Sequence, residues 1–154
     1  MDDLDRTYLF GAHCYRVPSP PLEQVVEDMT TMKHLGMNLA NFQISWSWCN
    51  PREGEYDFSD LSTLLSKSAE IGLFASITLT MEQMPKWVWD KHPDCRLVNA
   101  RGQIHHDPSQ YVMPADGKPG PCWDHTGARE EAERFLQGLL DAVRGFPHLA
   151  YWNL

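Results

Sequence analysis

The feature that most constrains this 154-residue sequence is a regular alternation of short apolar runs with segments that have helical periodicity. The apolar runs predict strands at residues 8–15, 37–45, 73–79 and 149–154. The helical segments, each followed closely by a glycine, lie at residues 20–35, 61–71 and 128–143. Strands that alternate with helices pair in parallel, so the order of elements predicts an α/β fold with a parallel sheet.

The first helix carries the clearest boundary signals. Ser19 can cap its N-terminus, Pro20 fits its first helical position, and Leu35 completes its apolar face. The stretch of residues 81–125, by contrast, is rich in Pro, Gly, His and Trp and predicts a long irregular loop after the third strand. Structureless loops of this length are uncommon in compact domains unless they carry function, so we expect functional residues there.

Two parallel-sheet architectures fit this order of elements, a doubly wound open sheet and a (β/α)₈ barrel. The first strand-to-helix turn contains neither G-x-G-x-x-G nor G-x-x-x-x-G-K-[ST], so a nucleotide-binding open sheet lacks its phosphate cradle and ranks last. We therefore predict a partial TIM barrel of about four βα units, with the long loop after the third strand. Because a complete barrel takes roughly 250 residues, residues 1–154 are expected to form one truncated domain, about half of a barrel.

Charge and cysteine content argue against several classes of function. Thirteen basic against twenty-one acidic residues give a net charge of -8, and no run of Lys or Arg offers a surface for phosphate backbones, so nucleic acid is not an expected partner. The acidic start and the lack of a long apolar segment predict neither a secretory leader nor a membrane span, hence a cytoplasmic location. The widely spaced Cys14, Cys49, Cys95 and Cys122 are expected to be free thiols.

Polar and aromatic residues gather after the predicted strands, and in a barrel the loops after the strands share one face. The candidates on this face are Tyr15, Trp46, Trp48, Glu82, Trp87, Trp89, His105, His106, Tyr111, Trp123, Asp124 and His125. A sugar presents apolar C–H faces and a rim of hydroxyls, so aromatic rings beside carboxylates, amides and imidazoles favour a carbohydrate ligand. About half of the six tryptophans are expected to pack within the loop instead.

Other chemistries have weaker support in the sequence. Residue types that bind zinc stand at His105, His106, Cys122, Asp124 and His125. Their separations match no standard zinc spacing, so neither a metal nor another cofactor is predicted. Glu82, directly after the third strand, can hold a hydroxyl or move a proton, although a solvated loop carboxylate is at least as well supported. No G-x-S-x-G elbow is present for serine catalysis.

Several short motifs carry a resemblance to a known family. Leu35-Gly36-Met37-Asn38, then Trp46-Ser47, then Pro51-Arg52-Glu53-Gly54-Glu55-Tyr56-Asp57-Phe58 occur in that order. This series resembles the first βαβ unit of family 42 β-galactosidases, which belong to the large retaining clan of barrel glycosidases. Farther on, Met84-Pro85-Lys86-Trp87-Val88, His92-Pro93 and Asn99-Ala100-Arg101-Gly102 are similar to the family's Pro-Pro-x-Trp-Leu, Tyr-Pro and Asp-Gly elements. The similarity thus runs along nearly the whole chain.

The last five residues, 150–154, resemble the family's fourth strand, which an acid/base glutamate follows within three residues. The resemblance implies that this glutamate, and the nucleophilic glutamate of a much later strand, both lie outside the chain, which then contains no catalytic residue. Two positions depart from the family. Asn41 stands where the family usually has an Arg, and Asn50 stands where it usually has a Glu. The exact sugar is therefore left open.

The resemblance implies a parent protein that hydrolyses terminal β-linked sugars with retention, β-galactosides first, and a 154-residue chain that is inactive alone. Its expected sugar contacts are Tyr15, Trp46, Trp87, Trp123 and Asn153. The alternative is a non-catalytic carbohydrate-binding or scaffold fragment of a clan-related barrel, which predicts the same fold. A half barrel leaves its first and fourth strands unpaired, so the isolated chain is expected to dimerise or aggregate.

Overall fold

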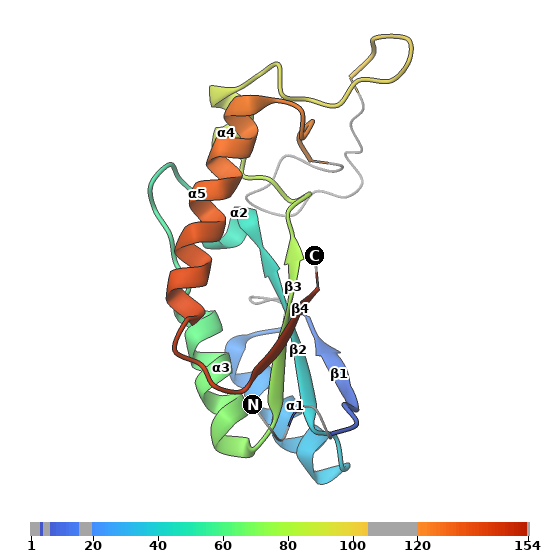
Figure 1. Cartoon of the computed structure of the whole chain (residues 1–154), viewed down its shortest axis with the longest axis vertical. Coiled ribbons are helices and arrows are strands. Elements are labelled where there is room, and N and C mark those ends of the chain that lie inside the picture. The colour runs from blue at the N-terminus through green and yellow to red at the C-terminus, as the bar shows by residue number, and fades with distance from the viewer. Residues whose placement is uncertain (1–3, 5–6, 16–19, 105–119, 154) are drawn as a thin grey trace. The chain divides into compact units, whose positions relative to one another are not determined.

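The computed structural model describes residues 4, 7–15, 20–104 and 120–153 (Figure 1). The strands are β1 (Gly11–Cys14), β2 (Leu39–Ser45), β3 (Phe74–Thr80) and β4 (Leu149–Asn153). The helices are α1 (Leu22–His34), α2 (Trp46–Cys49), α3 (Ser59–Ile71), α4 (Lys86–Lys91) and α5 (Thr126–Val143). The strands form one sheet in the order β1-β2-β3-β4, in which β1 pairs with β2 and β3 pairs with β4 in parallel. The predicted α/β class with a parallel sheet is confirmed.

The chain divides into two compact units. Unit 1 consists of Met1–Ile44, Ser59–Leu79 and Val143–Leu154, and it holds the sheet together with α1 and α3. Unit 2 consists of Ser45–Phe58 and Thr80–Ala142, and it holds α2, α4 and nearly all of α5. No helix in the described part of the chain combines the length and the apolar character that a membrane crossing requires.

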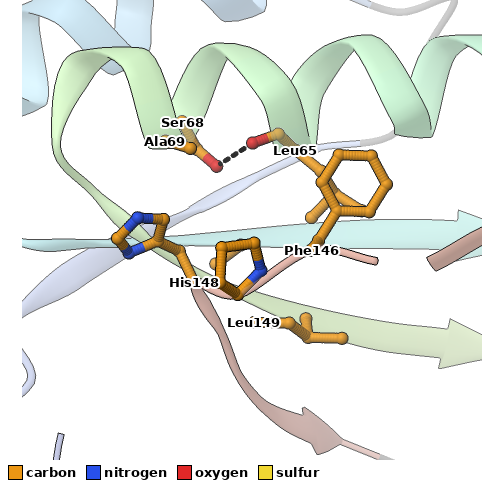
Figure 2. A pocket seen from close by; sticks show the side chains of 8 residues that line it. Leu65, Ser68, Ala69, Phe146, His148 and Leu149 are labelled. Carbon is orange, nitrogen blue, oxygen red and sulfur yellow. Dashed lines mark hydrogen bonds between the residues drawn. The ribbon is translucent and has the colours of Figure 1, made fainter. Parts of the chain in front are cut away.

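In unit 1, the two helices cover one face of the sheet. The Cys14 thiol of β1 lies 3.9 Å from the Met32 sulfur of α1, and Ala75 of β3 lies against Leu65 and Ser68 of α3. Figure 2 shows the α3 contact, where the Ser68 hydroxyl donates to the carbonyl of Leu65. The hollow between α3 and the sheet measures only about 10 Å³, which is too small for a ligand. This face is the apolar core of the unit.

The buried faces of the helices in unit 1 agree with the faces that the sequence periodicity predicts. The buried residues of α1 are Val25, Met29 and Met32, and those of α3 are Leu61, Leu64, Leu65 and Ser68. The start of α1 differs from the prediction, because Pro21 is its N-cap and Pro20 lies outside the helix, while Ser19 lies outside the described residues. Leu35 is the C-cap and is 68% exposed, so it points away from the face that it was predicted to complete.

The first strand is shorter and more exposed than the predicted buried strand at residues 8–15. Only Cys14 of β1 is buried, because β1 lies at the edge of the sheet and has one neighbour. Before β1 the backbone is held both by backbone hydrogen bonds, from the N–H groups of Asn38 and Leu39 to the Phe10 carbonyl, and by a side chain. The amide of Asn38 donates to the Tyr8 carbonyl at 2.9 Å and accepts from the Phe10 N–H at 2.8 Å. Burial of β1 therefore depends on a second neighbour that the sheet of unit 1 does not supply.

Gly11 lets β1 approach β2 closely. A Cβ at this position would stand 1.9 Å from the Leu39 carbonyl oxygen, which is backbone and cannot rotate away. We expect Gly11→Ala to lower the free energy of unfolding by about 1–3 kcal/mol, because β1 must separate from β2 to accept the methyl group. Gly145→Ala is the control, since nothing lies within 4 Å of that site. Equal urea midpoints for the two variants would contradict this account.

Unit 2 contains helices where the sequence predicted loop. Residues 46–54 begin with the single turn α2, and the stretch at 81–125 contains α4, whose Val88 and Trp89 are buried. The long helix α5 agrees with its predicted face, and its buried residues in this unit include Ala128, Ala132, Phe135 and Leu139. At its start, Gly127 allows close packing, because a Cβ there would stand 2.5 Å from the ring of His92.

Candidate functional site

One face of the sheet in unit 1 carries a row of polar side chains that crosses all four strands. This polar row consists of His13 on β1, Asn41 on β2, Ser76 and Thr78 on β3, and Asn153 on β4. The strand register pairs His13 with Asn41 and Thr78 with Asn153, so these side chains project from the same face. Alternate residues of the same strands, such as Ala40 and Phe42, are buried toward the helices. The polar row is therefore the face that the helices of unit 1 leave uncovered.

Asn41 is the centre of the hydrogen bonds in the polar row. Its Nδ2 donates to Ser76 Oγ at 2.7 Å, and its Oδ1 accepts from Thr78 Oγ1 at 2.9 Å. The Oδ1 atom also lies 2.6 Å from His13 Nδ1, which therefore carries the donated hydrogen. At the other end, Asn153 Nδ2 donates to Thr78 Oγ1 at 3.4 Å. The amide of Asn41 is thus fixed in one orientation.

Two of the residues expected to contact sugar lie at opposite ends of the polar row. Tyr15 directly follows β1 and is 51% exposed, with its ring 6.1 Å from that of His13 in an edge-on arrangement. Asn153 is exposed on β4 and connects to His13 through Thr78 and Asn41. Ser76 has no exposed surface, but the Thr78 hydroxyl, the amides and the imidazole of the polar row are groups that recognise neutral polar ligands.

Of the polar row, only Asn153 was predicted to contact sugar, and Asn41 was noted only as a departure from a family pattern. The missing signal was the two-residue periodicity of β2, where Asn41 and Gln43 alternate with Phe42 and Ile44. Gln43 Oε1 lies 3.4 Å from His13 Nε2, so this residue also reaches the polar row. Periodicity alone could not show which face the helices leave open.

In unit 2, five aromatic residues stack in one continuous series. This aromatic stack runs through Trp123, Trp46, Phe135, Phe58 and Tyr56, with neighbouring ring centroids 5.8 to 6.5 Å apart. Trp123 is 44% exposed at one end, whereas Trp46 beneath it is fully buried. Trp46 was expected to contact sugar, but its ring offers no free face and instead supports the ring of Trp123.

Asn50 joins the aromatic stack to the loop that follows α2. Its Oδ1 accepts from Trp46 Nε1 at 3.2 Å, and its Nδ2 donates to the carbonyls of Arg52 and Glu55, each at 2.8 Å. The Asn50 carbonyl accepts from Trp87 Nε1 at 2.9 Å. Trp46 and Trp87, both expected to contact sugar, thus meet at this one buried residue.

The other candidates have varied surroundings. Trp89 is buried with the guanidinium of Arg96 4.3 Å above its ring, whereas Trp48 is 39% exposed. His125 caps α5, because its Nδ1 accepts from the Ala128 N–H at 3.1 Å. Glu82 is half-buried and Asp124 is exposed.

Three further candidates, His105, His106 and Tyr111, lie outside the described residues. Among the residues that the structure describes, no group of three His, Cys, Asp or Glu side chains could hold a metal ion.

Glu131 is the centre of an ion cluster in unit 2. Its Oε1 lies 2.9 Å from Lys91 Nζ and 2.6 Å from Arg134 Nη2, and Lys91 also pairs with Glu53. The Glu131 side chain is only 3% exposed. Burial acts to raise its pKa, but the hydrogen bonds from Arg134 and Lys91 outweigh burial and hold the pKa of Glu131 below its usual value.

This lowered pKa predicts acid sensitivity. The contribution of Glu131 to stability is complete above about pH 4.3, the ordinary pKa of an unfolded glutamate, and is lost as pH falls through the lower folded pKa. We expect Glu131→Gln to lower Tm at neutral pH and to flatten its fall in acid. Thermal unfolding from about pH 6 to about pH 3 measures both effects. Parallel curves for the two proteins would show that Glu131 does not carry the acid sensitivity.

Comparison with known proteins identifies relatives of this chain. The chain is 24% identical to β-galactosidase Bga of Halorubrum lacusprofundi over 91% of its own length and 19% of that protein. It is 36% identical to β-galactosidase LacZ of Heyndrickxia coagulans over 83% of its own length and 18% of that protein. The chain thus spans about a fifth of the length of these relatives.

A solved structure and a family model complete the comparison. The β-galactosidase of the Antarctic haloarchaeon Halorubrum lacusprofundi superposes on 94% of this chain and 20% of its own with a TM-score of 0.76, at 21% identity. This likeness confirms the predicted fold, a partial (β/α)₈ barrel. A model of glycoside hydrolase family 42, described as β-galactosidase, matches residues 14–154. The chain therefore belongs to glycoside hydrolase family 42, the β-galactosidase family.

Proposed function

We propose that this chain supplies part of the substrate site of a retaining β-glycosidase that acts on terminal β-galactosides. The observation that carries the proposal is the family match over residues 14–154, together with relatives that are themselves named β-galactosidases. The polar row and the exposed Trp123 add groups that suit a sugar, since hydroxyls need polar partners and the C–H face of a pyranose needs an aromatic ring.

The reaction needs two carboxyl groups. In a retaining glycosidase one carboxylate attacks the anomeric carbon while another carboxylic acid protonates the leaving oxygen, and the two stand roughly 5 Å apart. We place neither group in this chain. A general acid needs a raised pKa, whereas the buried Glu131 has a lowered pKa and is occupied by Lys91 and Arg134. We propose that the chain lines part of the site and is inactive alone.

The sugar contacts that we propose are a tyrosine and an amide in unit 1 and tryptophans in unit 2. In unit 1, Tyr15 and Asn153 are exposed at the ends of the polar row, where they can meet a ring face and a hydroxyl. In unit 2, Trp123 offers an exposed ring and Trp87 is half-buried. Trp46 acts through Trp123, by holding that ring in place from beneath.

The test is a substrate panel applied to the gene product read through to its natural stop codon. Chromogenic β-galactoside, β-glucoside and β-mannoside are supplied separately, and proton NMR identifies the first anomer released. Preferred cleavage of the β-galactoside with release of the β-anomer is the expected result. Preference for another sugar would refute the substrate, and release of the α-anomer would refute the retaining mechanism. A folded but silent product would favour a carbohydrate-binding or scaffold role.

The sheet edges of unit 1 predict self-association of the 154-residue chain. Among the described strands, β1 and β4 each have one neighbour, so both expose backbone hydrogen-bonding groups. A hollow of about 370 Å³ opens beside β1 and is lined by Ala12–Tyr15, Pro20, Val25, Asp28 and Met32. We expect light scattering to report dimers or larger species at micromolar concentration. A monodisperse monomer that remains folded would contradict this expectation.

A further inference from the structure

Three side chains of the polar row form a hydrogen-bond relay that ends at a proposed sugar contact. This amide relay consists of Asn41 on β2, Thr78 on β3 and Asn153 on β4. Thr78 Oγ1 donates to Asn41 Oδ1 at 2.9 Å, and Asn153 Nδ2 donates to Thr78 Oγ1 at 3.4 Å. The strand register also pairs Thr78 with Asn153. The hydroxyl of Thr78 thus contacts both amides.

The single hydrogen of the Thr78 hydroxyl gives the amide relay a direction. Asn41 Nδ2 donates to Ser76 Oγ at 2.7 Å, so Asn41 Oδ1 faces Thr78 and His13 as an acceptor. The hydroxyl hydrogen of Thr78 is then used toward Asn41. Toward Asn153 the Thr78 oxygen can only accept, so this bond must be donated by Asn153 Nδ2.

This direction decides which end of the Asn153 amide faces away from Thr78. A side-chain amide carries its NH₂ group and its carbonyl oxygen on opposite sides of one carbon, so an Nδ2 atom directed at Thr78 turns Oδ1 away from it. Asn153 is exposed, and the last torsion of an asparagine side chain otherwise has two broad orientations. A held amide presents its acceptor in one place and loses less conformational freedom when a ligand binds.

The inner part of the amide relay is held more firmly than its end. Asn41 and Thr78 are half-buried, and Ser76, which accepts from Asn41, has no exposed surface. Their bonds of 2.7 and 2.9 Å have ordinary lengths, whereas the 3.4 Å bond from Asn153 is long. The buried members therefore set the direction of the amide relay, and Asn153 follows it.

We propose that Thr78 is a positioning residue for the sugar, which orients the Asn153 amide so that Oδ1 accepts from a sugar hydroxyl. Asn41 sets the direction of the Thr78 hydroxyl, and Thr78 acts through Asn153 rather than by contact with the sugar. The group that fits is a neutral hydroxyl that donates its hydrogen to Oδ1. This inference rests on the proposed function, because it assigns a role within the same site.

A double-mutant cycle in the gene product read through to its natural stop codon tests this role. The variants are Thr78→Val, Asn153→Ala and the two combined, and kcat/KM for a chromogenic β-galactoside is measured. We expect Thr78→Val to lower kcat/KM roughly 3- to 10-fold, the effect of one hydrogen bond, and Asn153→Ala to lower it further. The combined variant should match Asn153→Ala within about twofold, because Thr78 then has no amide to orient.

Two control variants separate the hydroxyl of Thr78 from its packing. Thr78→Ser keeps the hydroxyl and should stay within about twofold of the parent kcat/KM, whereas Thr78→Val keeps the branched shape and loses the hydroxyl. Thr30→Val makes the same chemical change on an exposed position of α1, where Thr30 Oγ1 donates to the Val26 carbonyl at 3.1 Å. This variant should also stay within about twofold of the parent. Urea unfolding checks that each variant is folded.

Crystal structures of the Thr78→Val and Thr78→Ser products test the orientation apart from activity. In Thr78→Val we expect the Asn153 side chain to occupy more than one orientation, because its Nδ2 atom has lost its acceptor. In Thr78→Ser it should keep the orientation of the parent. An Asn153 side chain that keeps the single parent orientation in Thr78→Val would overturn the proposal.

Three kinetic outcomes would also overturn the proposal. The first is an unchanged kcat/KM in Thr78→Val. The second is a combined variant in which the two losses multiply, because Thr78 would then act independently of Asn153. The third is an equal loss in Thr78→Ser and Thr78→Val, which would assign the effect to packing. A folded parent product that hydrolyses no β-galactoside would instead refute the proposed function, and the crystal structures would then decide whether Thr78 orients Asn153.

Discussion

Trp46→Ala is expected to lower the free energy of unfolding by about 3–5 kcal/mol, the largest effect predicted for any single side chain here. The ring of Trp46 is fully buried and stacks between Trp123 and Phe135. Its removal leaves a cavity lined by aromatic rings and deprives Asn50 of the hydrogen bond from Trp46 Nε1. Urea unfolding followed by far-UV circular dichroism measures the loss without relying on tryptophan fluorescence.

Trp48→Ala is the matched control for this substitution. Trp48 lies in the same short helix, α2, but is 39% exposed, so its removal should change the unfolding free energy by less than about 1 kcal/mol. Trp46→Phe should fall between the two, because phenylalanine keeps one aromatic ring in the stack but loses the indole hydrogen bond and part of the buried volume. Similar losses for Trp46→Ala and Trp48→Ala would show that the aromatic stack does not stabilise unit 2.

Asn50→Asp is expected to cost about 2–4 kcal/mol at neutral pH despite its nearly identical shape. The carboxylate cannot donate to the carbonyls of Arg52 and Glu55, and it places a negative charge at a site that is 1% exposed. Protonation of the new Asp side chain restores one hydrogen-bond donor and removes the charge, so the loss of unfolding free energy should be smaller in acid. Chemical unfolding at neutral and at acidic pH measures this dependence.

Asn99→Asp is the corresponding control. Asn99 Oδ1 accepts from the N–H groups of Arg101 and Gln103, which a carboxylate oxygen can also do. The one bond that Asn99 Nδ2 donates, to Gln103 Oε1 at 3.0 Å, is exposed to water, which can replace it. This variant should differ from the parent by less than about 0.5 kcal/mol. A loss of stability in Asn50→Asp that does not depend on pH would refute the role of the buried Asn50 amide as a donor. An equal loss of stability in Asn99→Asp would refute it as well.

The long helices and the parallel order of the strands were predictable because their signals are local. The apolar residues of α1, α3 and α5 recur every three or four positions, so each helix has one apolar face to bury. The short α4 was missed because its six residues depend on burial of Val88 and Trp89 rather than on periodicity. The extent of β1 was wrong for a related reason, since strand burial depends on the number of neighbouring strands.

The candidate site was harder to predict because it depends on strand register and on burial. Trp46 and Trp123 look alike as loop tryptophans, yet one is fully buried and the other is 44% exposed. In the sequence, Asn41 and Asn50 stood out only as departures from the family pattern. In the structure each is the centre of a hydrogen-bond network, one on the open face of the sheet and one beneath the aromatic stack. Neither network follows from sequence spacing.

The central claim is that this chain forms part of a β-galactosidase site without supplying its carboxylates. The most direct test is hydrolysis of a chromogenic β-galactoside by the 154-residue chain, side by side with the gene product read through to its natural stop codon. The account predicts turnover by the longer product and none above the uncatalysed rate by the 154-residue chain. Turnover by the 154-residue chain would contradict the claim, and loss of that turnover in a folded Glu82→Gln variant would place a catalytic carboxylate among its residues.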